Sequence, residues 1–332
     1  MTATDVARVA RVSQSTVSLV LNGKWRGRIS EQTARRVLAT ADELAYRINH
    51  AARSLRLGRT GTILLVVPTI ADPVFAAVHA GAARLGASTG LGVVVFPLGA
   101  EDGRGPFPVP RQALDGVIAC AVAASAVSQL RIGLPLVVLD EAPAVGTPAV
   151  TMDIGGGMAK ALAHLIALGH RRILHVRAER RAWTFARRAE VFDHCVLSHP
   201  FVTATRLRCP FAPADLRERL LRVLAAPDRP TAVVCDDDAI AMGVYAASVA
   251  LDLTVGQDLS VIGFNDLPTA APVSPPLTSV RLPFEELGSL GLRTLIGLRD
   301  GTVGESAAQV AELPTELVVR QSVGPAPSAR TW

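Results

Sequence analysis

The chain has 332 residues, 49% of them hydrophobic, which allows two or three domains with substantial cores, and no run approaches the roughly 18 consecutive apolar residues of a membrane span. Its positive charge lies at one end: residues 1–60 hold 11 Lys/Arg and four Asp/Glu, a net +7, whereas the whole chain carries +5. This asymmetry favours nucleic acid as the partner of residues 1–60, although a solvated basic surface would have the same composition.

Three short helices are predicted in the basic segment. The sequence Thr2-Ala-Thr-Asp matches a capping box that opens the first helix. Residues 11–13 predict a tight turn, after which Ser13 caps a second helix over 14–21. Ser30 caps a third helix, whose core face we predict as Val37, Leu38, Ala41 and Leu44. Two helices joined by a tight turn and followed by a third predict a helix-turn-helix unit that places its second helix in the major groove.

From residue 61 onwards the pattern changes to short apolar runs separated by helical stretches. Such runs predict buried parallel strands with helices on both faces of each sheet. Two groups of runs predict two lobes, with a ligand cleft at the carboxyl ends of the strands. The predicted strands are 62–67, 92–96, 115–119, 136–139, 173–176, 231–235 and 259–264.

Several motifs in order along the chain resemble the lac-repressor (LacI/GalR) family. The resemblance rests on DVARVARVSQSTVSLVLNGK, ISEQTARRVLATADELAYR, AARSLRLGRTGTILLVVP, DPVFA, LGHRRI, DDDAIAMG and LSVIGFND…PPLTSV. It implies a small all-α helix-turn-helix headpiece followed by an α/β bilobal core similar to periplasmic binding proteins, with two doubly wound parallel sheets. It also implies a dimeric regulator of transcription, which we expect to be a repressor.

The resemblance assigns DNA contacts in the headpiece. Gln14, Ser15 and Leu19 occupy base-reading positions of the recognition helix. The positions that hold the phosphate backbone are Thr2, Ser13, Thr16, Ser18 and Asn22. Leu19 departs from the arginine common in the family, so the base read there is expected to differ. Arg11 replaces a glycine common at the turn, which costs about 1 kcal/mol if that position needs a positive φ.

Residues 47–60 match the hinge of the family, which becomes helical on operator DNA. Leu55 holds the position of a leucine that wedges into the minor groove and kinks the duplex. The neighbouring hinge positions are Asn49, His50 and Ala52. A leucine in a linker can instead pack locally. Ile48 stands where a proline is common, so we expect the hinge helix to begin less sharply.

The resemblance also divides the core. We expect an effector-binding and dimerisation domain over 61–322, with crossings between the lobes near residues 155, 282 and 312. The expected parts are a DNA-binding domain at 1–46, an N-lobe at about 61–155 and 283–311, a C-lobe at about 156–282 and 312–322, and a flexible tail at 323–332. No leucine heptad follows the core, so we expect a homodimer rather than a tetramer.

Candidate effector residues follow from strand ends together with the resemblance. They are Asp72, Phe75, Asp140, Arg188, Asp237 and Asn265. Carboxylates and amides with one arginine suit the hydroxyls of a sugar, on which Phe75, Trp183 or Phe264 could stack. Two alternatives remain open: the aspartates at 236–238 could cap the following helix, and Arg188 could be a surface charge. Asp237 stands where the family commonly has asparagine.

We therefore predict a sequence-specific transcriptional regulator whose affinity for a pseudo-palindromic operator is set by a small molecule, with a carbohydrate favoured over a purine co-repressor. A solute-binding protein would need an export signal, and Arg8 and Arg11 interrupt the place of its apolar region. The sequence lacks GxxxxGK[ST], GxSxG and CxxC patterns, so we expect no enzyme activity, no cofactor and no metal. We expect a cytoplasmic location and no membrane partner.

Overall fold

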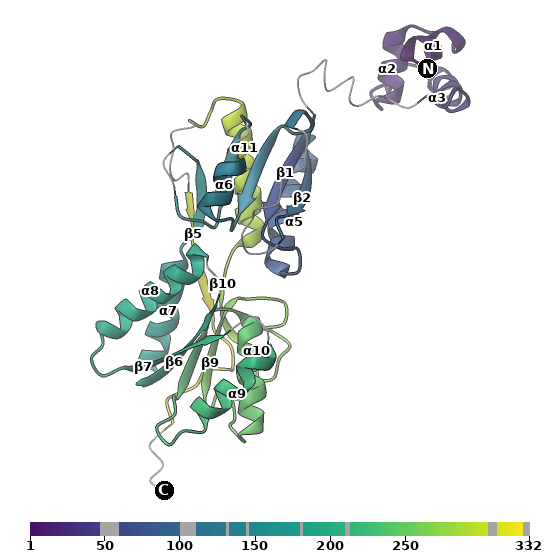
Figure 1. Ribbon diagram of the computed structural model, residues 1–332. Coiled ribbons are helices and arrows are strands. Elements are labelled where there is room, and N and C mark those ends of the chain that lie inside the picture. The colour runs from purple at the N-terminus through teal and green to yellow at the C-terminus, as the bar shows by residue number, and fades with distance from the viewer. Residues whose placement is uncertain are drawn as a thin grey trace. The chain divides into compact units, whose positions relative to one another are not determined.

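The computed structural model describes residues 1–46, 60–99, 111–130, 133–143, 146–179, 182–209, 213–304 and 311–327. The chain divides into two compact units, Met1–Thr60 and Gly61–Trp332 (Figure 1). No helix among the described residues is both long and apolar enough to cross a membrane.

The first unit is a bundle of three helices around a small apolar core. Its helices are α1 (Ala3–Val9), α2 (Gln14–Leu21) and α3 (Glu31–Glu43). Thr2 and Asp5 form the predicted capping box, and Ser13 and Ser30 cap the other two helices. The core consists of Val6, Ala7, Ala10, Val17, Val20, Ala34, Val37 and Ala41.

One predicted core residue of this unit is exposed. Leu38 keeps 47% of its surface in contact with solvent, whereas Val37 is fully buried. Consecutive helical residues point about 100° apart, so a narrow helix face in a small bundle can bury only one of the two. Leu44 is partly buried against the core, as predicted.

The second unit contains two six-stranded sheets, one in each lobe (Figure 1). The N-lobe sheet is parallel throughout, in the order β11-β5-β4-β3-β1-β2. Its strands are β1 (Thr62–Val67), β2 (Gly92–Pro97), β3 (Gly116–Cys120), β4 (Leu136–Leu139), β5 (Ala149–Met152) and β11 (Ala311–Leu313). Its helices are α5 (Pro73–Thr89), α6 (Ala124–Leu130) and α11 (Phe284–Arg299), with a 3₁₀ turn at Arg111–Ala113.

Alternate residues of β1 fill two separate apolar layers of the N-lobe. Ile63, Leu65 and Val67 pack in one layer with α5 and α11, whereas Leu64 and Val66 pack in the other with α6. Successive side chains of a strand point to opposite faces, so this run of apolar residues specifies a sheet covered on both sides.

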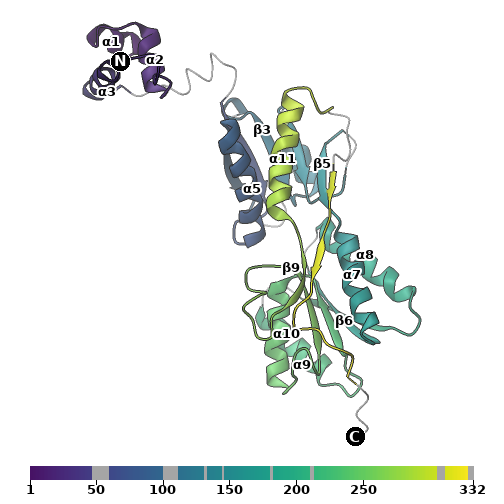
Figure 2. The same cartoon turned by 180° about the vertical axis from the view of Figure 1, so that it is seen from behind.

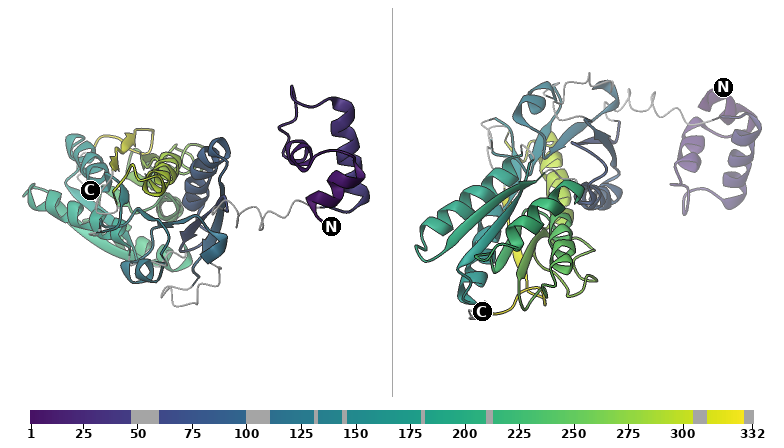
Figure 3. Two further views of the ribbon diagram at one scale, coloured as in Figure 1. Left: turned by 90° about the horizontal axis from the view of Figure 1, so that it is seen from above. Right: turned by 60° about the horizontal axis from the view of Figure 1, so that its bottom comes forward.

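The C-lobe sheet has the order β12-β10-β9-β8-β6-β7. Its strands are β6 (Arg172–Ala178), β7 (Thr203–Cys209), β8 (Ala232–Cys235), β9 (Ser260–Asn265), β10 (Thr278–Arg281) and β12 (Glu316–Val318). The helices are α7 (Ile154–Ala167), α8 (Trp183–Leu197), α9 (Pro213–Leu224) and α10 (Asp238–Ala250). Helices α7 and α8 cover one face, and α9 and α10 cover the other (Figure 1 and Figure 3). Strand β12 runs antiparallel to β10, so the prediction of a purely parallel sheet is wrong for the C-lobe.

The chain passes between the two lobes three times. It leaves the N-lobe sheet after β5, returns to the N-lobe between β10 and α11, and leaves again between β11 and β12. The C-terminal end is held: the amide of Ala326 donates to the carbonyl of Leu168 at 2.8 Å, and that of Gly324 donates to Ser260 Oγ at 3.1 Å. The tail predicted from residue 323 is therefore ordered at its start.

Helices α5 and α11, far apart in the sequence, pack closely side by side (Figure 1 and Figure 2). A Cβ atom at Gly81 of α5 would collide with the backbone of Glu285, and one at Gly288 of α11 would collide with the backbone of Val78. The absence of side chains at both positions thus permits direct backbone contact between the helices. Helix α11 is therefore an integral part of the N-lobe.

Candidate functional site

Helix α2 presents a polar, exposed surface at its N-terminal end. Gln14, Ser15 and Ser18 are exposed, Leu19 is half-buried, and the inward positions Val17 and Val20 are buried. The predicted base-reading positions thus have accessible side chains on the helix that follows the turn. This is the arrangement that a recognition helix needs to reach base edges.

Several side chains predicted to contact phosphates form hydrogen bonds at the ends of α1 and α2. Ser13 Oγ accepts a hydrogen bond from the amide of Thr16 at 3.1 Å and lies 2.7 Å from Ser15 Oγ and 2.9 Å from Thr16 Oγ1. At the other end, Asn22 Nδ2 donates to the carbonyl of Ser18 at 2.6 Å. In α1, Thr2 Oγ1 donates to Asp5 at 3.0 Å. The bonds of Ser13 and Thr2 hold their hydroxyls at the N-terminal ends of α2 and α1, where the partial positive charge of the helix favours an anion, whereas Asn22 lies at the C-terminal end of α2.

Cationic side chains flank this surface. Arg11, Lys24, Arg26 and Arg28 are exposed, and none of them forms an ion pair with another described residue. Arg11 adopts φ 54°, so the turn requires the positive φ that glycine would supply without strain. The hinge residues Asn49, His50, Ala52 and Leu55 lie outside the described residues.

Arg188 is the buried cation of the C-lobe, and only 2% of its surface is exposed. Its guanidinium lies between two aromatic rings, with Cζ 4.2 Å from the centroid of Phe264 and 5.0 Å from that of Phe185. Nη1 donates to the backbone carbonyl of Asp236, whereas the buried Nε has no hydrogen-bond partner. The alternative that Arg188 is a surface charge is therefore wrong.

Asp140, at the end of β4 in the N-lobe, is a buried carboxylate. It adopts φ 54°, and its buried Oδ1 has no hydrogen-bond partner. Burial raises the pKa of Asp140 to about 7, although the nearby charge of Arg188 acts in the opposite direction. Burial lowers the pKa of Arg188, and the carboxylates of Asp236 and Asp140 oppose that change. Two groups from different lobes thus interact electrostatically across the seam between the lobes.

The other predicted effector residues have structural partners. Asp72 caps α5 through a 3.2 Å hydrogen bond from the amide of Val74, and Phe75 is buried in the N-lobe core. Asp237 caps α10, its Oδ1 accepting from the amide of Ala239 at 2.7 Å, and its Oδ2 accepts from Asn265 Nδ2 at 2.6 Å. The capping alternative left open by the sequence is therefore correct for Asp237.

A cavity of about 350 Å³ opens between the lobes beside these residues. Two charged residues line it: Glu141 from the N-lobe, whose pKa burial raises, and Arg177 from β6 of the C-lobe. None of the six predicted effector residues is in its lining, although Trp183 is. The remaining lining residues are Ala123, Ala124, Ala178, Ala182, Phe185 and Ala186. Sequence reasoning missed Arg177 and Glu141, although each directly follows a predicted strand or a predicted site residue.

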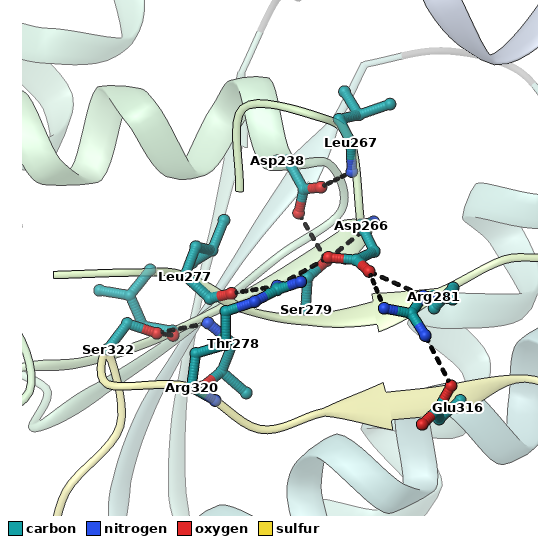
Figure 4. A network of polar contacts seen from close by, with 11 residues as sticks. Asp238, Asp266, Leu267, Leu277, Thr278, Ser279, Arg281, Glu316, Arg320 and Ser322 are labelled. Carbon is teal, nitrogen blue, oxygen red and sulfur yellow. Dashed lines mark hydrogen bonds and ion pairs between the residues drawn. The ribbon is translucent and has the colours of Figure 1, made fainter. Parts of the chain in front are cut away.

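A polar network ties the end of β9 to the strands that lead into the lobe crossings (Figure 4). Asp266 binds Arg281 at 2.8 Å and Arg320 at 2.7 Å, and Arg281 binds Glu316 at 3.0 Å. Arg281 is the last residue of β10 and Glu316 the first of β12. The network thus lies next in sequence to Asn265, one of the candidate effector residues.

Asp238 belongs to the same network. Its carboxylate accepts 2.6 Å hydrogen bonds from Ser279 Oγ and from the amide of Leu267 (Figure 4). Burial raises the pKa of Asp238 to about 7, and these two bonds limit the rise. No group of three or more potential metal ligands is found among the described residues.

Two family models match the chain. "Bacterial regulatory proteins, lacI family" matches residues 2–49, and "Periplasmic binding protein-like domain" matches residues 162–323. The HTH-type transcriptional regulator MalR of Streptomyces coelicolor is 31% identical over 98% of this chain and 97% of its own length. The ribose operon repressor of Haemophilus influenzae is 31% identical over 88% of this chain and 90% of its own length.

The fold is also similar to that of solved structures. A structure of the lac repressor dimer bound to operator and the anti-inducer ONPF has a TM-score of 0.83 at 24% identity and covers 97% of this chain and 98% of the other. The complex of the transcriptional regulator CelR with cellobiose has a TM-score of 0.69 at 25% identity, covering 97% and 99%.

Proposed function

The chain belongs to the lacI family of bacterial regulatory proteins, and on that premise we propose that it is a repressor whose affinity for a pseudo-palindromic operator is set by a small molecule between its lobes. Arg188 and Asp140 carry the effector part of this proposal. Both are buried, they come from different lobes, and each has a polar atom without a partner. Buried unpartnered polar groups are costly, and a ligand with hydroxyls would satisfy both of these.

A sugar or sugar derivative fits this seam best. A hydroxyl both donates and accepts hydrogen bonds, so a polyol can bind Arg188 Nε and Asp140 Oδ1 together. Trp183 and Phe185 line the adjacent cavity and offer aromatic faces for the apolar side of a sugar ring. The ribose operon repressors among the relatives favour the same class. A purine is the second candidate, because PurR of Haemophilus influenzae is 29% identical over 96% of the chain.

For DNA binding, we propose that α2 enters the major groove, with Gln14, Ser15 and Leu19 at base edges. Two headpieces of a homodimer would read the two halves of the operator. Leu55 of each subunit would wedge into a central step of the minor groove. Replacing Leu55 with alanine is then expected to reduce both operator affinity and the bend angle of the bound DNA; unchanged bending would contradict the wedge.

The proposed mechanism is thermodynamic linkage between two sites. Effector binding changes the angle between the lobes, and this change shifts the two hinge segments of the dimer. Effector and operator must then change each other's affinity by the same factor. The relatives are regulators of transcription, and we propose no enzyme activity for this chain.

The deciding experiment is selection of operator sequences from random DNA by the purified protein at fixed near-physiological salt, with and without ribose, maltose, cellobiose, hypoxanthine and guanine. Enrichment of a palindromic site that one compound abolishes or enhances would support the whole proposal. Enrichment unaffected by every compound would support the operator and contradict this choice of effector class. Salt-sensitive binding without enrichment would contradict sequence-specific recognition.

A further inference from the structure

Asp236, at the end of β8, has every polar group engaged. Its amide donates to the carbonyl of Val176 at 3.0 Å. In its carboxylate, Oδ1 accepts from His175 Nε2 at 2.8 Å, and Oδ2 accepts from the amide of Ala178 at 3.0 Å. Its carbonyl oxygen accepts from Nη1 of Arg188. The orientation of the group that holds Arg188 is thus fixed by contacts on its other sides.

Apart from Arg188 itself, His175 is the only side chain among these contacts. It lies on β6, and both it and Asp236 are fully buried. The hydrogen bond to Asp236 requires the hydrogen on Nε2, and Nδ1 is buried without a partner. Its ring stacks on Phe192, with centroids 4.5 Å apart and an interplanar angle of 29°. Phe192 is one turn beyond Arg188 on α8, so His175 contacts both the partner of Arg188 and the helix that bears it.

Fold stability alone is a weak reason for this pair. A buried polar pair gives little net stability compared with apolar residues of similar size, because both groups must lose their hydration. Ile173, two residues before His175 on the same face of β6, is apolar and buried. An apolar residue at 175 would fit the same sheet but would leave Oδ1 of Asp236 without its hydrogen bond, and apart from Arg188 only the backbone contacts to Val176 and Ala178 would then hold this residue.

We propose that His175 is a positioning residue for effector recognition: through Asp236 it fixes the carbonyl oxygen that holds the guanidinium of Arg188 at the seam between the lobes. The claim rests on the proposed function, in that Arg188 is taken as a group that binds the effector. His175 itself is not assigned to the effector, because its ring is enclosed by Asp236 and Phe192.

Three variants of the full chain separate positioning from stability. His175→Leu removes the hydrogen bond and keeps an apolar volume, whereas His175→Gln keeps an N–H donor at similar reach. His170→Gln is the matched control: His170 is also fully buried, but its ring bonds Thr231 Oγ1 at 2.9 Å and the carbonyl of Gly324 at 3.0 Å. Far-UV circular dichroism and Tm establish that each variant is folded, and His175→Met replaces the leucine variant if that one is not.

The first readout needs no effector. In protein labelled with ¹⁵N-arginine, the side-chain signals of Arg188 are identified by their loss in Arg188→Lys. A guanidinium held in place rotates slowly about Nε–Cζ and gives separate Nη signals. We expect separate signals in the wild type, His175→Gln and His170→Gln, and averaged or shifted signals in His175→Leu. An unchanged Arg188 spectrum in folded His175→Leu would overturn the proposal, as would an equal change in His170→Gln.

The second readout is calorimetric titration with D-ribose and with cellobiose. Loss of one hydrogen-bonded support for a charged group is expected to raise Kd on the order of tenfold in His175→Leu, with little change in His175→Gln and His170→Gln. An unchanged Kd in His175→Leu would contradict the positioning role. Failure of the wild type to bind either sugar would count against the proposed function alone, because the arginine spectrum decides the positioning claim without a ligand.

Discussion

The side-chain amide of Asn265 donates a 2.6 Å hydrogen bond to the carboxylate of Asp237, so two residues predicted to contact the effector are bound to each other. Asp237 is also the N-cap of α10. One carboxylate therefore joins the end of β9 to the start of a helix, with Oδ2 and Oδ1 on separate partners.

This dual role predicts different costs for two substitutions at residue 237. Asp237→Ala removes both bonds and is expected to lower the free energy of unfolding by about 1–3 kcal/mol. Asp237→Asn retains an oxygen for the cap and is expected to cost less than about 1 kcal/mol. Urea unfolding at constant pH measures both, and equal costs would show that the cap is not what Asp237 contributes.

Asp140 predicts a specific dependence of stability on pH. Its pKa is about 7 in the folded protein, against an ordinary value of 3.8 for an aspartate, so between about pH 4 and 7 the folded state binds a proton that the unfolded state has lost. The free energy of unfolding therefore falls across this window, and the full penalty for burying the ionised carboxylate is present above pH 7. Asp238 has a raised pKa as well and contributes in the same direction.

Asp140→Asn isolates the contribution of this residue, because asparagine has a similar shape and no charge. The stability of the wild type relative to this variant is expected to fall by a few kcal/mol, in order of magnitude, from pH 4 to 7 and to stay level above it. Chemical unfolding at each pH provides the curves. Parallel curves for the two proteins would refute the assignment.

The turn between α1 and α2 predicts a stabilising substitution. Because Arg11 adopts φ 54°, Arg11→Gly is expected to raise the stability of the first unit by about 1 kcal/mol. Arg11→Ala is the control, since it removes the same charge and keeps the strain. Hydrogen exchange of the amides in α1 and α2, together with thermal unfolding of the full chain, measures the difference in stability between the two variants. Equal stability of Arg11→Gly and Arg11→Ala would contradict the predicted strain at residue 11.

Leu19 predicts a change in operator preference without a change in fold. Leucine can only make apolar contacts, for instance with a thymine methyl, whereas arginine can bind guanine through O6 and N7. Leu19→Arg is expected to change the preferred base at one position in each half-site. Selection and sequencing of bound DNA tests this, with Leu38→Arg, an exposed position on α3, as the control that should leave the preference unchanged.

We expect the members of the network around Asp266 to contribute unequally to the free energy of unfolding. Only 6% of the Asp266 side chain is exposed, and it serves two arginines, whereas Glu316 is 65% exposed and serves one. Asp266→Asn is expected to destabilise the protein by about 1–3 kcal/mol, and Glu316→Gln by less than about 1 kcal/mol. Urea unfolding would contradict this if the order were reversed.

Most of the predicted strands are apolar runs buried on both faces; the edge strand β2 was also predicted, because its sequence is apolar although it is only partly buried. Each of the seven apolar runs overlaps a strand, as at Thr62–Val67, because a continuous apolar run has no polar face to obscure it. Strand β7, Thr203–Cys209, was missed: it is a sheet edge, and its polar side chains are mostly exposed. Strands β5 and β10 were also missed, since each has four residues with Thr or Arg among them, and β11 and β12 have only three residues each, too few for a pattern to emerge.

The site was predictable in part for a similar reason. The structure brings the charges of Arg188 and Asp140 together across the seam, and their role in effector binding stays a prediction. The resemblance did not indicate that Asp237 and Asn265 pair, since a bond between distant strand ends depends on the register of the sheet. Arg177 and Glu141 meet at the cavity through the contact of two lobes, which no local pattern contains.

The close backbone contact of α5 and α11 has a consequence for synthesis of the protein on the ribosome. The strands from β1 to β5 emerge first, yet Leu65 and Leu139 share a core with residues of α11, which is made only after the whole C-lobe sheet except β12. Until then the face of the N-lobe sheet that packs against α5 and α11 is not covered by α11. Premature termination before residue 284 should therefore yield a fragment that aggregates or is rapidly degraded, not a stable DNA-binding protein. Because such a fragment would not compete for the operator, nonsense alleles of this kind are expected to be recessive.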